Sequence, residues 1–163
     1  MTLLWKISVA CPFFVPLEIV NDGSWPHPAR LPLGAGWSGA CCASGQEAAA
    51  DAATGAPATS ATLVAVDAAY IREFCNLGYA TACPHLPRVR DWDAVRFSVA
   101  SSSPQEIILC YVCELGHAPV EHGTLNYDLV DEAWRRVPQD PRVRRLAKSY
   151  LHAYRARKRG GVI

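Results

Sequence analysis

Two stretches near the middle of the chain have the alternating, β-branched composition of strands. The first is AVRFSVA at 94–100, and the second is EIILCYVCE at 106–114. The segment SSSPQ between them consists of polar residues and a proline, which is typical of a turn. The sequence therefore predicts an antiparallel β-hairpin over residues 94–114.

A helical spacing of apolar residues precedes this hairpin. Asp67 has the right side chain for an N-cap, and Gly78 is placed to end the helix in the left-handed conformation. Between them, apolar residues recur at helical spacing: Tyr70, Ile71, Phe74, Cys75 and Leu77. We expect a helix here that carries Cys75 in its last turn. The segment YATACPHLP after it contains two prolines and predicts a turn.

A pair of helices is expected after the hairpin, beyond the polar loop LGHAPVEHG. Asp128 would cap the first helix and Pro138 would stop it, with one apolar face formed by Leu129, Val130, Ala133, Trp134 and Val137. Asp140 and Pro141 are the favoured N-cap and first-turn residues of a second, longer helix that ends before Gly160. Its apolar stripe is Val143, Leu146, Ala147, Tyr150, Leu151 and Tyr154.

The N-terminal part of the chain has a different character. Residues 1–30 contain four prolines and show no sustained period, so we expect an irregular arm. Residues 43–62 are mostly Ala, Ser, Thr, Gly and Pro, which favours a flexible insertion. The 163 residues leave room for one domain. We therefore predict a single small α+β domain over 31–163, with the arm before it.

Charge is balanced over the whole chain but not along it. The net charge is +1, yet ten of the sixteen basic residues lie between Arg135 and Arg159, and no acidic residue follows Asp140. The end of the last helix could contact phosphates of a nucleic acid, or a protein partner, through Arg155, Arg157, Lys158 and Arg159. The alternative is an ordinary amphipathic helix whose basic face is solvated.

Seven cysteines are present, an odd number for a disulfide framework. The first apolar run of the chain is interrupted by Lys6 and followed by Pro12 and Pro16, which is a poor export signal. No run approaches the ~20 apolar residues that span a bilayer. We expect a cytoplasmic protein without a membrane segment, where clustered cysteines more often bind metal than form disulfides.

Four cysteines, one from each of four segments, form the predicted ligand set of an iron–sulfur cluster or a zinc ion: Cys42, Cys75, Cys83 and Cys113. Cys83 precedes Pro84, and a Cys-Pro step is a familiar end of cluster motifs. Cys110 and Cys113 lie three apart in a predicted strand, so their side chains should face opposite sides. The alternative ligands are Cys41, Cys110, His117 and His122. The competing interpretation is that these cysteines are buried thiols without a ligand.

The segment CNLGYATACPHLP, followed by WDAVRFSV, resembles a motif of small, largely uncharacterised bacterial cysteine-containing proteins. Over residues 75–87 it is also distantly similar to the YkgJ-type family of proposed zinc- or iron–sulfur-binding proteins. The closely spaced cysteine quartet expected in that family is missing here. The resemblance implies metal binding at Cys75 and Cys83 and implies no reaction.

No residue set in the chain specifies a reaction, so we expect a metal- or iron–sulfur-binding accessory protein rather than an enzyme. A nucleic-acid-binding regulator that uses the basic last helix is the alternative. A third hypothesis is a small enzyme that uses His117 and Glu121, because imidazole and carboxylate together can transfer protons.

Overall fold

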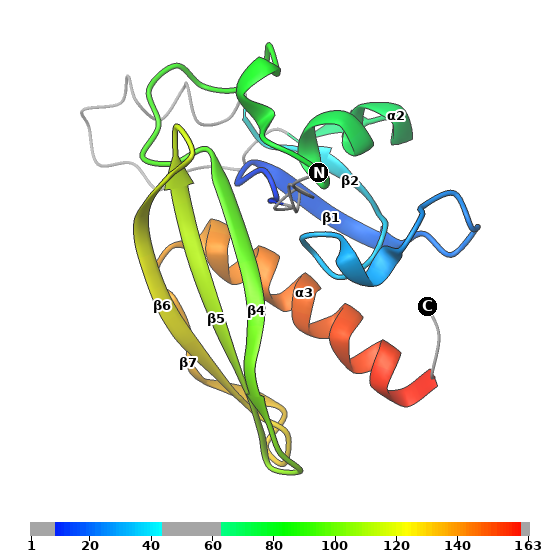
Figure 1. Cartoon of the computed structure of the whole chain (residues 1–163), viewed down its shortest axis with the longest axis vertical. Coiled ribbons are helices and arrows are strands. Elements are labelled where there is room, and N and C mark those ends of the chain that lie inside the picture. Colours follow the sequence, from blue (N-terminus) through cyan, green and yellow to red (C-terminus); the bar gives the residue numbers. More distant parts are fainter. Residues whose placement is uncertain (1–8, 44–62, 161–163) are drawn as a thin grey trace, which may run out of the picture.

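The computed structural model describes residues 9–43 and 63–160 and shows an α+β fold, as predicted. It has two antiparallel sheets and a long C-terminal helix (Figure 1). The first sheet has the order β1 (Phe14–Ile19), β2 (Trp37–Cys41) and β3 (Val64–Val66). The second has the order β4 (Ala94–Ser102), β5 (Glu106–Leu115), β6 (Ala118–Asp128) and β7 (Ala133–Arg136). Short helical segments are η1 (Pro28–Arg30), α2 (Ala68–Tyr70), η2 (Ile71–Cys75) and η3 (Ala80–Ala82), and the last helix is α3 (Pro141–Gly160).

The predicted hairpin is confirmed as β4 and β5, with Phe97 opposite Tyr111. Alternation along β5 buries one face of this sheet, since Ile107, Leu109 and Cys113 are 2% exposed or less. The residues between them, from Glu106 to Val112 on the opposite face, are only half-buried. The buried face is the one that contributes to the core.

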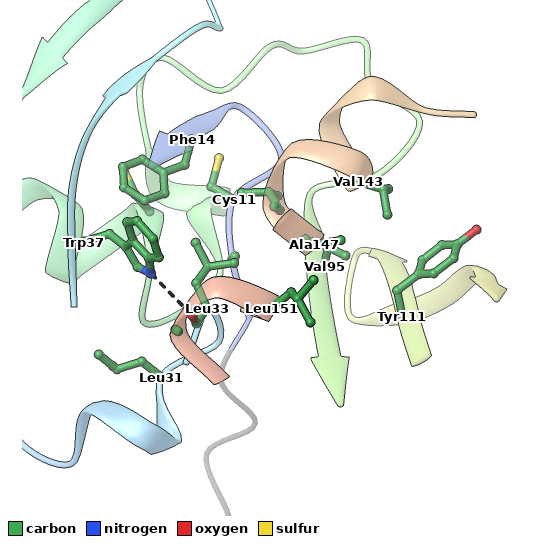
Figure 2. Close-up of a cluster of buried hydrophobic side chains, with 14 of the residues drawn as sticks. Cys11, Phe14, Leu31, Leu33, Trp37, Val95, Tyr111, Val143, Ala147 and Leu151 are labelled. Carbon is green, nitrogen blue, oxygen red and sulfur yellow. Dashed lines mark hydrogen bonds between the residues drawn. The ribbon is translucent and has the colours of Figure 1, made fainter. Parts of the chain in front are cut away.

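Helix α3 is confirmed with its predicted cap, because Asp140 Oδ1 accepts a hydrogen bond of 2.8 Å from the Arg142 amide. Gly160 is still helical, one residue beyond the expected end. The predicted apolar stripe of α3 faces inward. Four of its residues are buried: Val143, Leu146, Ala147 and Leu151. They belong to the core cluster drawn in Figure 2, which also takes residues from both sheets. The helix therefore joins the two sheets through one core.

The predicted helix over 128–137 is wrong. Asp128 does cap, but it caps a turn: its Oδ1 accepts from the amides of Val130 and Asp131 over 2.7 and 2.9 Å. The chain then returns as β7, which places Trp134 opposite Tyr127 on β6. An edge-on contact between the two rings, with centroids 5.2 Å apart, favours the strand pairing over the helix.

The irregular N-terminal arm is also wrong for the residues that the structure describes. Phe14–Ile19 form β1 and pair with β2, and Phe13, Phe14 and Trp25 are buried in the core. The aromatic residues that looked aperiodic are therefore core residues of the smaller sheet. The predicted flexible insertion at 43–62 lies, except for the buried Ala43, outside the described residues.

The helix predicted from Asp67 is confirmed at its start, because Asp67 Oδ1 accepts from the Tyr70 amide over 2.9 Å. It ends earlier than expected. The Asn76 amide donates to the Ile71 carbonyl over 2.9 Å, a wide π-type turn that stops the helix at Cys75. Asn76, rather than Gly78, ends the helix, and Gly78 does not take a positive φ.

The polar loop expected at 115–123 is mostly strand. The chain reverses at Gly116 and His117, both with positive φ, and β6 begins at Ala118. Polar side chains on the open face of a sheet give no hydrophobic signal, which explains the error.

No helix in the described ranges combines the length and the apolar character needed to cross a bilayer.

Candidate functional site

Four cysteines from four separate segments line one cavity of about 490 Å³: Cys11, Cys41, Cys75 and Cys83. Cys11 lies in the turn before β1, and Cys41 is the last residue of β2. Cys75 is the last residue of η2, and Cys83 directly follows η3. The ends of these elements meet, which brings together four thiols that span 73 positions of the sequence, from 11 to 83.

Main-chain hydrogen bonds hold these segments against one another. Ala10 and Val95 exchange two such bonds, of 2.8 and 2.9 Å, which fixes the chain just before Cys11 onto β4. The Cys11 amide then donates to the Cys75 carbonyl oxygen over 2.9 Å. Within the last segment, the Cys83 amide donates to the Ala80 carbonyl over 2.8 Å. The backbone around three of the four thiols is therefore fixed by regular hydrogen bonds.

The walls of the cavity are mostly apolar and aromatic. Polar groups are few and include Asp67, Tyr70 and His85. The Asp67 carboxylate is already used to cap α2. The apolar wall is contributed mainly by Phe13, Phe14, Val64, Val66, Phe74, Pro84 and Leu86. Apolar surroundings influence the redox potential and the acidity of groups at a metal centre.

Hydrogen-bond donors are directed at the sulfur atoms. The Ala43 amide donates to Cys41 Sγ over 3.4 Å, and a backbone hydrogen bond from Phe13 partly offsets the burial that raises the pKa of the Cys11 thiol. The Tyr70 hydroxyl lies 2.9 Å from Cys83 Sγ. Donors to sulfur favour the thiolate form, which is the form that binds metal.

Burial acts against the thiolate and is the larger effect. Burial, with smaller contributions from the Cys41 and Cys83 thiols, raises the pKa of Cys75 to about 12. Burial is also the main cause of the raised pKa of Cys11 and of Cys41. Burial therefore favours the neutral form of the Cys11, Cys41 and Cys75 thiols, and a bound cation would be needed to compensate four thiolate charges in this cavity.

All seven cysteines lie in the described part of the chain, and each is a free thiol. Within residues 9–43 and 63–160, no three His, Cys, Asp or Glu side chains are grouped tightly enough for a single metal ion.

The predicted ligand set is brought together only in part. Cys75 and Cys83 line the cavity, whereas Cys42 and Cys113 do not. Cys42 Sγ points toward α3 and lies 3.7 Å from Arg145 Nη2. Cys113 lies under the start of α3, where burial, with smaller contributions from Glu121 and Asp140, raises its pKa to about 12. The side chains of Cys41 and Cys42 do point apart, as expected for neighbours in an extended chain.

The other alternative ligands are scattered, apart from Cys41. Cys110 is half-buried on the opposite face of β5 from the buried Cys113, as their spacing predicted. His117 lies at the tip of the β5–β6 hairpin, where its ring is 3.9 Å from that of Tyr79, centroid to centroid. His122 pairs with Val112 within the sheet. Glu121, considered with His117 for proton transfer, accepts from the Tyr111 hydroxyl over 3.0 Å.

Cys11 was missed by the sequence reasoning, although a signal was available. Cys11 is followed by Pro12 just as Cys83 is followed by Pro84, and each pair is preceded by alanine. The same Cys-Pro step that singled out Cys83 therefore occurs at Cys11. Placing Cys11 in an irregular arm removed it from consideration.

The basic end of α3 is largely engaged within the molecule. Arg155 Nη2 lies 3.1 Å from Glu132 Oε1, and Lys158 Nζ lies 2.8 Å from Ser102 Oγ. Arg157 donates to the carbonyl oxygen of Gly34, a residue held at a φ of 71°. Arg159 is exposed.

Comparisons of the chain with protein-family models, with curated proteins and with solved structures found no match.

Proposed function

We propose that this protein is a small metal-binding accessory protein in which Cys11, Cys41, Cys75 and Cys83 together hold an iron–sulfur cluster. The observation that carries the proposal is the convergence of these four thiols, from four separate segments, on one cavity. Four cysteine thiolates are the usual ligand set of an iron–sulfur cluster and of a structural zinc ion. Donors directed at the sulfur atoms and an apolar wall support the same function.

The size of the cavity favours a cluster over a single ion. Four thiolates around one zinc ion lie ≈2.3 Å from it, which brings the sulfur atoms within about 4 Å of one another and leaves no space between them. Here the four cysteines lie on the wall of a cavity of about 490 Å³ that thirteen other residues also line. A cluster of several iron and sulfide ions uses such space, and the cysteine sulfurs then lie at its corners. Zinc is the other possible outcome of the experiment below.

The test is metal analysis of protein purified without oxygen. Iron with matching sulfide, and a visible absorption band, are expected for the wild type. Each of Cys11→Ser, Cys41→Ser, Cys75→Ser and Cys83→Ser should lose most of the iron, because serine cannot replace a thiolate ligand well. A wild-type protein without bound iron or zinc would overturn the proposal.

Neighbouring cysteines provide the controls. Cys42→Ser changes the residue next to Cys41 but leaves the cavity intact, and Cys113→Ser changes a buried thiol under α3. Both should retain the iron of the wild type. Loss of iron in these two variants, with retention in Cys11→Ser and Cys41→Ser, would instead support the ligand set predicted from the sequence.

Nucleic-acid binding by the end of α3 stays a prediction with less support. Three of its four basic side chains contact protein atoms: Arg155, Arg157 and Lys158. Phosphate contacts would have to compete with these interactions. Binding that weakens steeply with salt would favour this alternative.

A further inference from the structure

The Tyr70 hydroxyl is held next to one of the four sulfur atoms. It lies 2.9 Å from Cys83 Sγ, while the amide of the same residue is bound by Asp67 at the start of α2. The Tyr70 ring packs against Phe74, with centroids 4.7 Å apart, and against His85, with centroids 6.0 Å apart. The backbone and both ring neighbours therefore fix the direction of the hydroxyl.

The chemistry of a ligating sulfur decides which atom donates. A free thiol and a tyrosine hydroxyl can each donate to the other. A cysteine sulfur that binds iron has lost its proton and can only accept. In the loaded site, the Tyr70 hydroxyl is therefore the donor and Cys83 Sγ the acceptor.

We propose that Tyr70 tunes the iron–sulfur centre by donating a hydrogen bond to the ligating sulfur of Cys83, and so raises its reduction potential. This inference rests on the function proposed above. Reduction adds one electron from an external one-electron donor, and no bond is made or broken. The added negative charge is shared by the ligating sulfurs, so a donor to sulfur stabilises the reduced state more than the oxidised state.

Tyr70 is the donor that a substitution can remove without changing the backbone. The donors to Cys11 and Cys41 are main-chain amides of Phe13 and Ala43. Tyr70→Phe keeps the ring, and with it the packing against Phe74, and removes only the oxygen atom. The predicted role thus belongs to a single hydroxyl group.

The experiment compares full-length wild-type protein and Tyr70→Phe, both purified without oxygen. Iron and sulfide content should be equal. The midpoint potential, measured by a dithionite titration followed in the visible spectrum, should be more negative in the variant. A tenfold change in the equilibrium constant for one-electron reduction would appear as a shift of about 59 mV.

Tyr79→Phe is the matched control. It makes the same chemical change on the segment between Cys75 and Cys83, but the Tyr79 hydroxyl donates to the Glu114 carboxylate and not to a cysteine. Its potential should equal that of the wild type. Equal shifts in both variants would show a general effect of removing a tyrosine hydroxyl near the cavity and would overturn the specific role of Tyr70.

A second measurement needs no variant. A hydroxyl proton exchanges with D₂O within the mixing time, whereas buried amides exchange slowly. Resonance Raman spectra of the wild type should therefore show a rapid shift of the iron–cysteine stretching band in D₂O. If the Tyr70→Phe variant fails to assemble an iron–sulfur cluster, the wild type alone still tests the inference. Absence of the rapid shift of its iron–cysteine stretching band in D₂O overturns the inference.

The remaining outcomes separate the two proposals. A wild type without iron overturns the iron–sulfur function and the role of Tyr70 with it. A wild type that binds zinc overturns the tuning role but leaves the four-cysteine site. Equal iron and equal potentials in the wild type and Tyr70→Phe overturn the tuning role alone.

Discussion

The amide of Cys11 donates to the carbonyl oxygen of Cys75 over 2.9 Å, so two of the cavity cysteines are joined through the main chain. The chain next to Cys11 is fixed in turn to β4 by the pair of hydrogen bonds between Ala10 and Val95, both of which are fully buried. The position of these two cysteines is therefore set by the folded backbone and does not depend on a shared ligand.

Metal removal is expected to lower stability without unfolding the protein, because of this main-chain framework. Binding to the native state alone stabilises it by RT ln(1 + [L]/Kd), about 2.7 kcal/mol at a hundredfold excess over Kd. Urea unfolding followed by circular dichroism, before and after treatment with a chelator, measures the change. The Cys75→Ser variant should not respond to the chelator. A chelated wild type that is already unfolded in buffer would contradict the prediction.

Arg145→Met should destabilise the protein, since Arg145 connects α3 to the turn that carries Cys11. Its guanidinium donates to the carbonyl oxygens of Pro12 and Phe14 over 3.0 and 3.3 Å. Loss of the donor leaves these acceptors unpaired, at a cost of roughly 1–3 kcal/mol. Lys148→Met, on the exposed face of the same helix, is the control and should change stability little. Equal urea midpoints for the two variants would contradict the prediction.

Local patterns were sufficient for the elements that have a clear period and a cap. The β4–β5 hairpin, the Asp67 cap and α3 were predicted, because alternation, capping and the apolar stripe are all local signals. The helix predicted over 128–137 was wrong because of a tertiary interaction. Its apolar residues fit a helical face, but pairing of Trp134 with Tyr127 across two strands decided the structure.

The candidate site was predictable only where its residues lie close in the sequence. Cys75 and Cys83 belong to one short segment, and both line the cavity. The other two cysteines, Cys41 at the end of β2 and Cys11 in the turn before β1, reach the cavity because of the way the two sheets meet. A local sequence pattern carries no information about that arrangement. Cys113 was included in the predicted ligand set, but the pleat of β5 turns its side chain toward α3.

Gly39→Ala should destabilise the smaller sheet and disturb the cysteine site. A Cβ at Gly39 would overlap the Val15 carbonyl oxygen and the Phe14 ring, and Phe14 forms part of the cavity wall. Overpacking of this kind costs typically about 1–3 kcal/mol. Gly78→Ala is the matched control, because a Cβ there meets no atom within 4 Å. Thermal unfolding of both variants measures the difference, and equal melting temperatures would exclude the close packing at Gly39.

Asp128 should make the stability of the protein depend on pH in the acid range. The amides of Asp131 and Val130 and the neighbouring Arg135 hold the pKa of its carboxyl below the ordinary value of 3.8. Between the native pKa and 3.8 the unfolded chain binds more protons than the native protein, so the free energy of unfolding falls as the pH falls through this range. The contribution is complete above pH 3.8, and Asp128→Asn, which cannot ionise, should flatten this part of the profile. Asp131→Asn, an exposed position in the same turn, should keep the wild-type slope in urea titrations from about pH 2 to pH 6. Identical slopes for Asp128→Asn and the wild type would show that the carboxylate of the turn does not contribute to acid sensitivity.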